Sequence, residues 1–481
     1  MKRPNILILY TDQQRFDALG ANGNKLIKTP NLDRLAAEGV NYSRCFVQNP
    51  VCMPSRISAM TGQYCSTLGI TRMGVPVPQD TLTIQKILKG YGYDTALIGK
   101  LHYLPHANRD HSQPHPEYDF NHMELSDEPG CYNDAYRAFV ARKAPDQLDL
   151  ISLGLPPATQ EWQKVLGFED GIKHPEIRTS SNSSAFPGRS DCTHTAFVGE
   201  QTIEYIKSRS PGRKSGGTPA GRKPFFCFSG FYSPHSPCIT PQEFIDLYPE
   251  KEMPVPGLSD AYTSKRPSDF TQVVQKMTSC YYAMVSEVDA WVGRIMEALK
   301  QSGLSDETIV VFTSDHGEWL GEHLRYGKGH WAPDIVSRIP MIYHVPKALG
   351  GITGVSTDEI TECVDIVPTL LCLAAIPIAP CIQGRILPVA ENLRQGINCE
   401  STYDGCGLTE MEGWRSLRSD KYRYVAGPGS TEMLFDISKD PNEYNNAAGT
   451  ASYRDALHEM RGMLIKRLMR IDRSKERIWV Y

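Results

Sequence analysis

Five short runs along the chain are almost continuously apolar, and none of them alternates with polar positions. They are NILILY (5–10), DTALIG (94–99), PFFCFSG (224–230), TIVVFT (308–313) and IPMIYHV (339–345). A strand that is apolar throughout is buried on both faces, which is typical of a parallel sheet covered by helices on each side. The pattern therefore predicts an α/β protein with a large, mostly parallel sheet between helices.

Helical patterns separate these runs. Thr29-Pro30 before NLDRLAAEG predicts a helix with Thr29 as its N-cap, Pro30 at its first position and a glycine stop. Residues 281–303 have the apolar spacing of a long amphipathic helix that ends at Gly303. In NPVCMPSRISAMTG (49–62) we expect a further helix to begin at Pro54.

The pattern changes near residue 385. Residues 413–427 and 432–437 predict antiparallel strands, and residues 452–471 predict a final helix. We therefore predict a large domain over 1–385 and a small C-terminal α+β domain over 386–481. Residues 103–195 look irregular, and 208–224 read as a flexible basic loop.

Composition excludes several classes of protein. The 481 residues carry a net charge of −4, which does not favour nucleic-acid binding, and no apolar run approaches the roughly 20 residues that span a bilayer. The apolar run at the N-terminus is too short for a signal peptide and leads directly into Asp12. Thirteen scattered cysteines suit a reducing compartment. These features predict a cytoplasmic location, or a periplasmic or secreted one if a signal peptide has been removed.

Charged and polar residues follow four of the predicted strands, at the point where each strand ends. They are Asp12 and Gln13, Lys100 and His102, His235, and Asp315 and His316. Ligands of open α/β sheets bind just beyond the carboxyl ends of the strands. The sequence therefore predicts that these side chains meet at one edge of the sheet.

These residues also have purely structural interpretations. Asp12 and Asp315 could cap helix N-termini, and Lys100 could be solvated. A lone histidine such as His235 more often makes a structural hydrogen bond than a catalytic one. The position that all of them share, after four separate strands, favours a site.

The set of possible ligands suggests which cation would bind. Asp12, Gln13, Asp315 and His316 offer mainly oxygen ligands with one imidazole. Such a set suits Ca²⁺ or Mg²⁺, with Mn²⁺ possible.

Cys52 stands near the predicted start of a helix, with Arg56 close by. The unpaired N–H groups of a helix N-terminus and an arginine would both stabilise an anion and lower the pKa of a thiol. Cys52 could thus be a thiolate nucleophile, a metal ligand or the precursor of a modified residue. It could also be an inert buried cysteine.

The motif Cys-x-Pro-Ser-Arg at 52–56 resembles the signature of type I sulfatases, in which the cysteine is oxidised to formylglycine. Further stretches resemble text of this family in the same order: GKLH (99–102), SPHSP (233–237), TSDHGEWLGEH (313–323), Lys328 in YGKGH, VDIVPTLLCLAAI (364–376) and LFDISKDPNEYNNAA (434–448). The similarity spans nearly the whole chain and is weakest over 103–195.

The resemblance implies an alkaline-phosphatase-like fold and a sulfuric ester hydrolase that cleaves a small-molecule or carbohydrate sulfate. It also implies a partner enzyme that generates the formylglycine. Hydrated formylglycine would attack the sulfur with one hydroxyl, and the ester would break when the other hydroxyl is deprotonated. The metal, expected to be Ca²⁺, would be held by residue 52 with Asp12, Gln13, Asp315 and His316. By the same resemblance the remaining site residues would be Arg56, which holds the diol, Lys100, His235 and Lys328, which bind the ester oxygens, and His102, the base.

One residue departs from the pattern of many sulfatases. Gln13 stands where they have a second aspartate, and an Asp-Gln pair is similar to that of phosphonate monoester hydrolases. A phosphonate monoester or phosphodiester hydrolase is therefore a rival hypothesis. A rival from another class is a non-catalytic anion-binding protein in which Cys52 stays a thiol.

Overall fold

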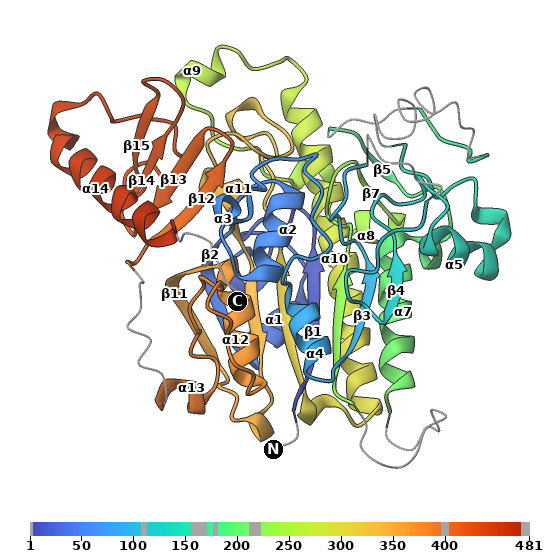
Figure 1. The fold of residues 1–481 in the computed structure, drawn as a ribbon. Helices are drawn as coiled ribbons and strands as arrows, with labels where there is room; N and C mark the ends of the chain where they lie inside the picture. Colours follow the sequence, from blue (N-terminus) through green and yellow to red (C-terminus); the bar gives the residue numbers. More distant parts are fainter. Residues whose placement is uncertain are drawn as a thin grey trace.

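The computed structural model describes residues 3–106, 113–154, 171–176, 181–210, 223–395 and 404–472. Its centre is a nine-stranded sheet with the order β11-β2-β10-β8-β1-β6-β3-β4, in which β9 also pairs with β2 (Figure 1). The strands are β1 (Asn5–Thr11), β2 (Val40–Phe46), β3 (Asp94–Gly99), β4 (His122–Leu125), β6 (Phe225–Gly230), β8 (Thr308–Ser314), β9 (Arg338–Ile339), β10 (Met341–His344) and β11 (Val355–Glu362). The run from β8 through β1, β6 and β3 to β4 is parallel throughout.

The predicted sheet is confirmed, with one difference at the fifth apolar run. This run is divided at Pro340 into β9 and β10, and β10 lies antiparallel to both β8 and β2. A proline has no backbone N–H to give to a neighbouring strand, so it interrupts the pairing at this point. The carboxyl end of β10 therefore lies at the opposite edge from the ends of the parallel strands.

Helices cover both faces of the sheet, as the unbroken apolar strands predict. Alternate residues of β1 serve two cores: Ile6 and Ile8 face one, and Leu7 and Leu9 face the other. On the first face lie α2 (Cys52–Thr61), α4 (Ile84–Gly90) and α12 (Ile366–Leu373), in front of the sheet in Figure 1. On the second face lie α1 (Pro30–Ala37), α5 (Ala135–Lys143), α7 (His194–Ser208) and α10 (Phe270–Gln301).

Shorter helices and a second, small sheet lie around the nine-stranded sheet. They are α3 (Cys65–Leu68), α8 (Gln242–Ile245), α9 (Asp260–Thr263), α11 (Asp334–Ser337), α13 (Glu391–Gln395) and the two-stranded sheet of β5 (Ser183–Ala185) and β7 (Cys238–Thr240). The region 103–195, predicted to be irregular, contributes only short elements between β3 and α7 among its described residues. Most of the predicted basic loop at 208–224 lies outside the described residues.

The N-cap of α1 and the start of α10 differ from the prediction. The helix α1 begins at Pro30 as predicted, but the Thr29 hydroxyl donates to Asp33, accepts the N–H of Gly20 and caps no N–H of the helix itself. The carboxylate of Asp289, on α10, accepts the N–H groups of Asn31 and Leu32 instead. The α10 helix itself begins at Phe270, ahead of the predicted start at 281.

The helix at the signature motif also begins earlier than predicted. α2 starts at Cys52, and Val51 in extended conformation is its N-cap. Cys52 is therefore the first residue of the helix, which places its side chain at the end where backbone N–H groups are unpaired.

The C-terminal residues form a separate antiparallel sheet, as predicted. It consists of β12 (Gly407–Met411), β13 (Trp414–Arg418), β14 (Tyr422–Ala426) and β15 (Glu432–Asp436), covered by α14 (Arg454–Ile471) (Figure 1). The Glu410 N–H of β12 donates to the Gln48 carbonyl at 2.7 Å, just ahead of the signature motif. The predicted domain boundary at residue 385 stays a prediction. Among the described residues, none of the helices combines the length and the apolar character needed to cross a bilayer.

A buried acid on α10 leads to a prediction about pH. The Glu287 carboxyl is 2% exposed and accepts the hydroxyls of Thr193 at 2.5 Å and Thr240 at 2.9 Å. Burial raises its pKa from the ordinary 4.5 to about 7. Because the folded pKa lies above the unfolded one, this acid stabilises the fold fully below pH 4.5. That contribution, about 3 kcal/mol, is lost as the pH rises to 7.

We expect the Glu287→Gln variant to lack this loss. The melting temperature of the variant minus that of the wild type, measured by circular dichroism, should therefore be larger at pH 8 than at pH 5. Glu297→Gln, at an exposed acid of the same helix, is the matched control and should show the same difference from wild type at both pH values. A Glu287→Gln variant whose difference from wild type is independent of pH would contradict the prediction.

Candidate active site

The parallel strands bring their carboxyl ends together at one edge of the sheet. The last residue pair of β1 and β8 is Thr11 beside Ser314, so Asp12 and Asp315 follow side by side. In the same way Gly99 of β3 pairs with Gly230 of β6, and the Lys100 N–H donates to the Gly230 carbonyl at 2.8 Å. The residues that follow these strands, which the sequence analysis singled out, therefore lie close together.

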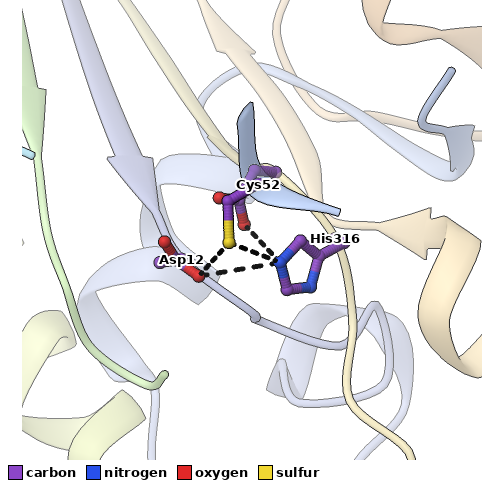
Figure 2. Close-up of side chains that lie close together, drawn as sticks. Asp12, Cys52 and His316 are labelled. Atoms are coloured by element: carbon purple, nitrogen blue, oxygen red, sulfur yellow. Dashed lines mark hydrogen bonds and ion pairs between the residues drawn. The ribbon is translucent and has the colours of Figure 1, made fainter. Parts of the chain in front are cut away.

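The N-terminus of α2 brings Cys52 to this edge. The thiol is fully buried, and its sulfur lies 3.2 Å from His316 Nε2 and 3.7 Å from Asp12 Oδ1 (Figure 2). One ligand atom from each of Asp12, Cys52, Asp315 and His316 lies within 4.8 Å of the other three. Cys52 and His316 are 264 positions apart in the chain, and Asp12 is farther still from His316.

The donor atoms of this cluster suit a divalent cation. His316 Nδ1 lies 2.8 Å from the Gly317 carbonyl, which can only accept, so a neutral ring has a lone pair at Nε2. The Gln13 side-chain oxygen is buried without a hydrogen-bond partner. Two carboxylates, a carboxamide oxygen and one imidazole form the oxygen-rich set that hard cations prefer.

Arg56 binds both carboxylates of the cluster. Its Nε donates to Asp315 Oδ2 at 2.8 Å, and its Nη2 donates to Asp12 Oδ2 at 3.1 Å. A third bond, from Nη1 to the Lys100 carbonyl, measures 3.0 Å. The guanidinium is fully buried, so these contacts balance its charge where water cannot.

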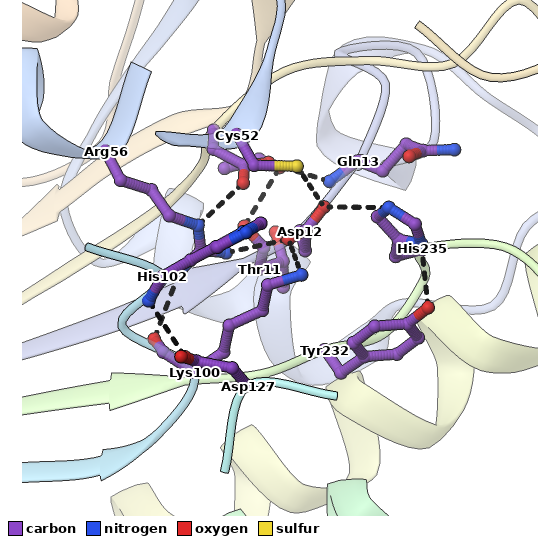
Figure 3. Close-up of polar contacts among 12 residues, drawn as sticks. Thr11, Asp12, Gln13, Cys52, Arg56, Lys100, His102, Asp127, Tyr232 and His235 are labelled. Carbon is purple, nitrogen blue, oxygen red and sulfur yellow. Dashed lines mark hydrogen bonds and ion pairs between the residues drawn. The ribbon is translucent and has the colours of Figure 1, made fainter. Parts of the chain in front are cut away.

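Cationic groups also lie close to the thiol. Lys328 Nζ is 2.6 Å from Cys52 Sγ and 2.8 Å from His235 Nε2. Lys100 Nζ contacts Asp12 Oδ2 at 2.7 Å and lies over the ring of Tyr232 (Figure 3). Several positive groups around one small volume form a site for an anion.

These charges shift the pKa values of the site. Burial and Asp12 oppose ionisation of Cys52, but Lys328 and His316 outweigh them and lower the pKa of the thiol. Burial likewise opposes ionisation of Asp12, yet Lys100 and other nearby cations hold its pKa well below the ordinary value. Burial, with the charge of Lys328, lowers the pKa of His235 well below its ordinary value. A neutral His235 fits its role as acceptor of the Lys328 proton.

His102 lies beside this group with an unusual backbone. Its φ is +58°, and both of its ring nitrogens are buried without a hydrogen-bond partner. The N–H groups of Leu101 and His102 both donate to Asp127 Oδ1 at 2.8 Å. Asp127 therefore holds the turn that presents the His102 ring.

All ten residues singled out from the sequence lie at this edge of the sheet. Three further residues that hold them were not predicted. Asp127 follows β4 and could have been found by applying the strand-end rule to HMEL (122–125). Tyr232, whose hydroxyl contacts His235 Nδ1 at 2.9 Å, stands only three residues before that histidine. Glu318 lies within the quoted motif TSDHGEWLGEH, and its side chain accepts a hydrogen bond from Gln13 Nε2.

Comparison with known proteins agrees with the fold and the motifs. Residues 4–376 match the model of the family described as Sulfatase. An arylsulfatase of Clostridium perfringens is 29% identical over 494 residues, covering 97% of this chain and 94% of the relative. An ulvan-active sulfatase of Formosa agariphila is 27% identical over 485 residues, covering 99% and 83%.

A solved structure supports the architecture. The phosphonate monoester hydrolase of Agrobacterium radiobacter superposes with a TM-score of 0.79 at 24% identity, covering 97% of this chain and 96% of that one. At this identity the likeness shows the fold alone. With the family match over most of its length, the chain therefore belongs to the sulfatase family of enzymes and has their alkaline-phosphatase-like fold.

Proposed function

We propose that this enzyme hydrolyses the sulfate monoester of an aryl or sugar alcohol, with a formylglycine made from Cys52 as its nucleophile. One observation carries the proposal: ligand atoms of Asp12, Asp315 and His316 converge on the Cys52 sulfur, and Lys328 Nζ lies 2.6 Å from the same atom. A sulfuryl transfer centre needs ligands for a metal cation and positive groups for the sulfate, both next to the nucleophilic side chain.

The residues available for a cation are Asp12, Gln13, residue 52, Asp315 and His316, and we expect Ca²⁺, with Mg²⁺ or Mn²⁺ as alternatives. A hydrated formylglycine would supply a hydroxyl nucleophile, and the bound cation would lower the pKa of that hydroxyl and attract the ester oxygens. Arg56, held between Asp12 and Asp315, would fix the orientation of the hydroxyl groups on residue 52.

Lys100, His235 and Lys328 would hold the sulfate. The three free oxygens of a sulfate monoester match three nitrogen donors once the His235 ring is protonated, and a charge-assisted hydrogen bond of this kind contributes roughly 1.5–3 kcal/mol. The Lys328–His235 pair, 2.8 Å apart, also has a proton to give to the departing alcohol oxygen.

His102 would act as the base in the second half of the reaction. Its ring nitrogens are buried and unpartnered, and Asp127 fixes the backbone beneath the ring. A nitrogen held in this way can accept the proton of the second hydroxyl of residue 52, after which the sulfate leaves.

A phosphonate monoester or phosphodiester hydrolase is the second candidate, and Gln13 favours it. A carboxamide in place of a second aspartate lowers the negative charge of the site by one, which makes it more tolerant of different anions. Sulfate monoesters, phosphonate monoesters and phosphodiesters all carry one negative charge, so charge alone does not separate them. A second organic substituent, however, removes one oxygen from the three nitrogen donors.

The test is a panel of substrates with one leaving group. On protein produced with a formylglycine-generating enzyme, we expect kcat/KM for 4-nitrophenyl sulfate to exceed that for 4-nitrophenyl phenylphosphonate by about tenfold or more, because one charge-assisted contact is lost. Measurable activity on the phosphonate should remain. A clear preference for the phosphonate or for bis(4-nitrophenyl) phosphate, with residual sulfate turnover, would favour the second candidate.

A further inference from the structure

Glu318 is a buried acid that no step of the proposed reaction uses. It is fully enclosed, two residues after His316, and it accepts three N–H donors. One carboxylate oxygen accepts the backbone N–H groups of Leu320 at 3.0 Å and Gly327 at 2.5 Å. The other accepts the side-chain amide of Gln13. Both oxygens of the Glu318 carboxyl are therefore engaged as hydrogen-bond acceptors.

The Gln13 side chain is held at one end and unsatisfied at the other. Its Nε2 donates to Glu318 and lies 3.5 Å from Ser236 Oγ, while its Oε1 is buried without a partner. In Figure 3 the amide nitrogen points away from Asp12 and Cys52. A buried carbonyl oxygen left unpaired costs about 1–3 kcal/mol, so this atom needs a ligand of its own.

The backbone of Gln13 is equally well fixed. Its φ is +70°, its N–H donates to Asp315 Oδ1 at 2.9 Å, and its carbonyl accepts the Tyr281 hydroxyl at 2.7 Å. With Nε2 bound to Glu318, the competing orientation of the side chain is the one that exchanges the amide nitrogen and oxygen. Rotating the amide would put its oxygen against the Glu318 carboxylate, where two acceptors repel each other.

We propose that Glu318 is a positioning residue that fixes the orientation of the Gln13 carboxamide, with the nitrogen bound to Glu318 and the oxygen left as a cation ligand. This inference rests on the metal site of the proposed function. Glu318 also holds the N–H of Gly327, the neighbour of Lys328. One carboxylate thus connects a metal ligand with the segment that carries an anion-binding lysine.

The test replaces the acceptor by a donor of the same shape. In Glu318→Gln, the remaining carbonyl oxygen can still accept from Leu320 and Gly327, but the new NH₂ group faces the NH₂ group of Gln13. The Gln13 amide must then rotate, which turns a donor toward the cation. We expect the affinity for Ca²⁺, measured by calorimetry on matured protein, to fall about 10–100-fold, the usual cost of losing a group that orients a ligand.

The reversed pair provides the rescue. In the double variant Gln13→Glu with Glu318→Gln, the amide at 318 donates to one carboxylate oxygen at 13 and leaves the other for the cation. We expect the Ca²⁺ affinity to return to within a few-fold of wild type. Because the reversed pair restores the donor–acceptor match, this variant tests the inference even if the single variant does not fold. Glu322→Gln is the matched control. Glu322 is a partly buried acid of the same segment and forms an ion pair with Arg15. Its replacement should leave the affinity for Ca²⁺ unchanged.

Two results would overturn the inference. One is a folded Glu318→Gln variant with wild-type affinity for Ca²⁺, and the other is a folded reversed pair whose affinity for Ca²⁺ stays about 10-fold or more below that of wild type. A wild-type protein that binds none of Ca²⁺, Mg²⁺ and Mn²⁺ would instead overturn the metal site of the proposed function, and this inference with it. The calorimetry of the wild type therefore separates the two failures.

Discussion

Cys52→Ala is expected to abolish turnover of every sulfate and phosphorus ester, because the variant loses the proposed nucleophile and a metal ligand together. The sulfur of Cys52 lies within 3.7 Å of Asp12, His316 and Lys328, so alanine at this position removes the atom on which these three side chains converge. The measurement is kcat/KM on 4-nitrophenyl sulfate, with both proteins produced beside a formylglycine-generating enzyme. Mass spectrometry of the wild-type peptide around residue 52 should detect the aldehyde.

Cys65→Ser is the matched control for this variant. Cys65 is also buried, and its thiol donates to the Pro54 carbonyl at 3.5 Å, a bond that a serine hydroxyl can make. We expect this variant to keep its activity. Full activity of Cys52→Ala would end the formylglycine hypothesis. A wild-type protein with an unmodified thiol that binds sulfate without turnover would support the anion-binding alternative.

Asp315→Asn is expected to lower kcat/KM at least ~100-fold and to weaken Ca²⁺ binding. The wild-type carboxylate accepts from Arg56 Nε at 2.8 Å and from the Gln13 N–H at 2.9 Å, so both oxygens are needed as acceptors. An asparagine offers one oxygen and turns an NH₂ group toward one of these donors. It also leaves the buried Arg56 with one carboxylate instead of two.

The measurement pairs kinetics with metal removal. Chelation should abolish the activity of the wild type, and Ca²⁺ or Mg²⁺ should restore it, whereas Asp315→Asn should need far more metal for any recovery. Asp306→Asn, at an exposed aspartate before the other end of β8, is the control and should behave like wild type. If metal-free wild-type enzyme keeps its full rate, the proposed ligand set fails.

Much of the site could be predicted because it depends on strand ends. Asp12, Lys100 and Asp315 each follow a strand whose apolar run is visible in the sequence, and parallel strands end at one edge of their sheet. The motif around Cys52 also predicted that a helix begins close to this residue. Local patterns also predicted α1 and α14 closely, since apolar periodicity reports directly on burial.

Contacts between distant segments could not be predicted in this way. Asp289 replaces the expected Thr29 cap of α1 from 258 positions away, because α10 packs beside α1. Gln13 and Glu318 are 305 positions apart, and the sequence does not show which end of the amide is held.

The sequence by itself determined the buried parallel strands at the centre of the sheet, the order of the chemical groups that follow them and the family, because apolar runs, strand ends and motifs are local properties of the chain. The tertiary structure alone decided which acceptor each buried donor meets. It showed that Asp127 accepts the backbone N–H of His102, that Arg56 joins Asp12 to Asp315, and that Glu318 accepts the side-chain amide of Gln13. The physical reason is that a buried polar group must find a partner within about 3 Å, and only the packing of distant segments brings that partner to it.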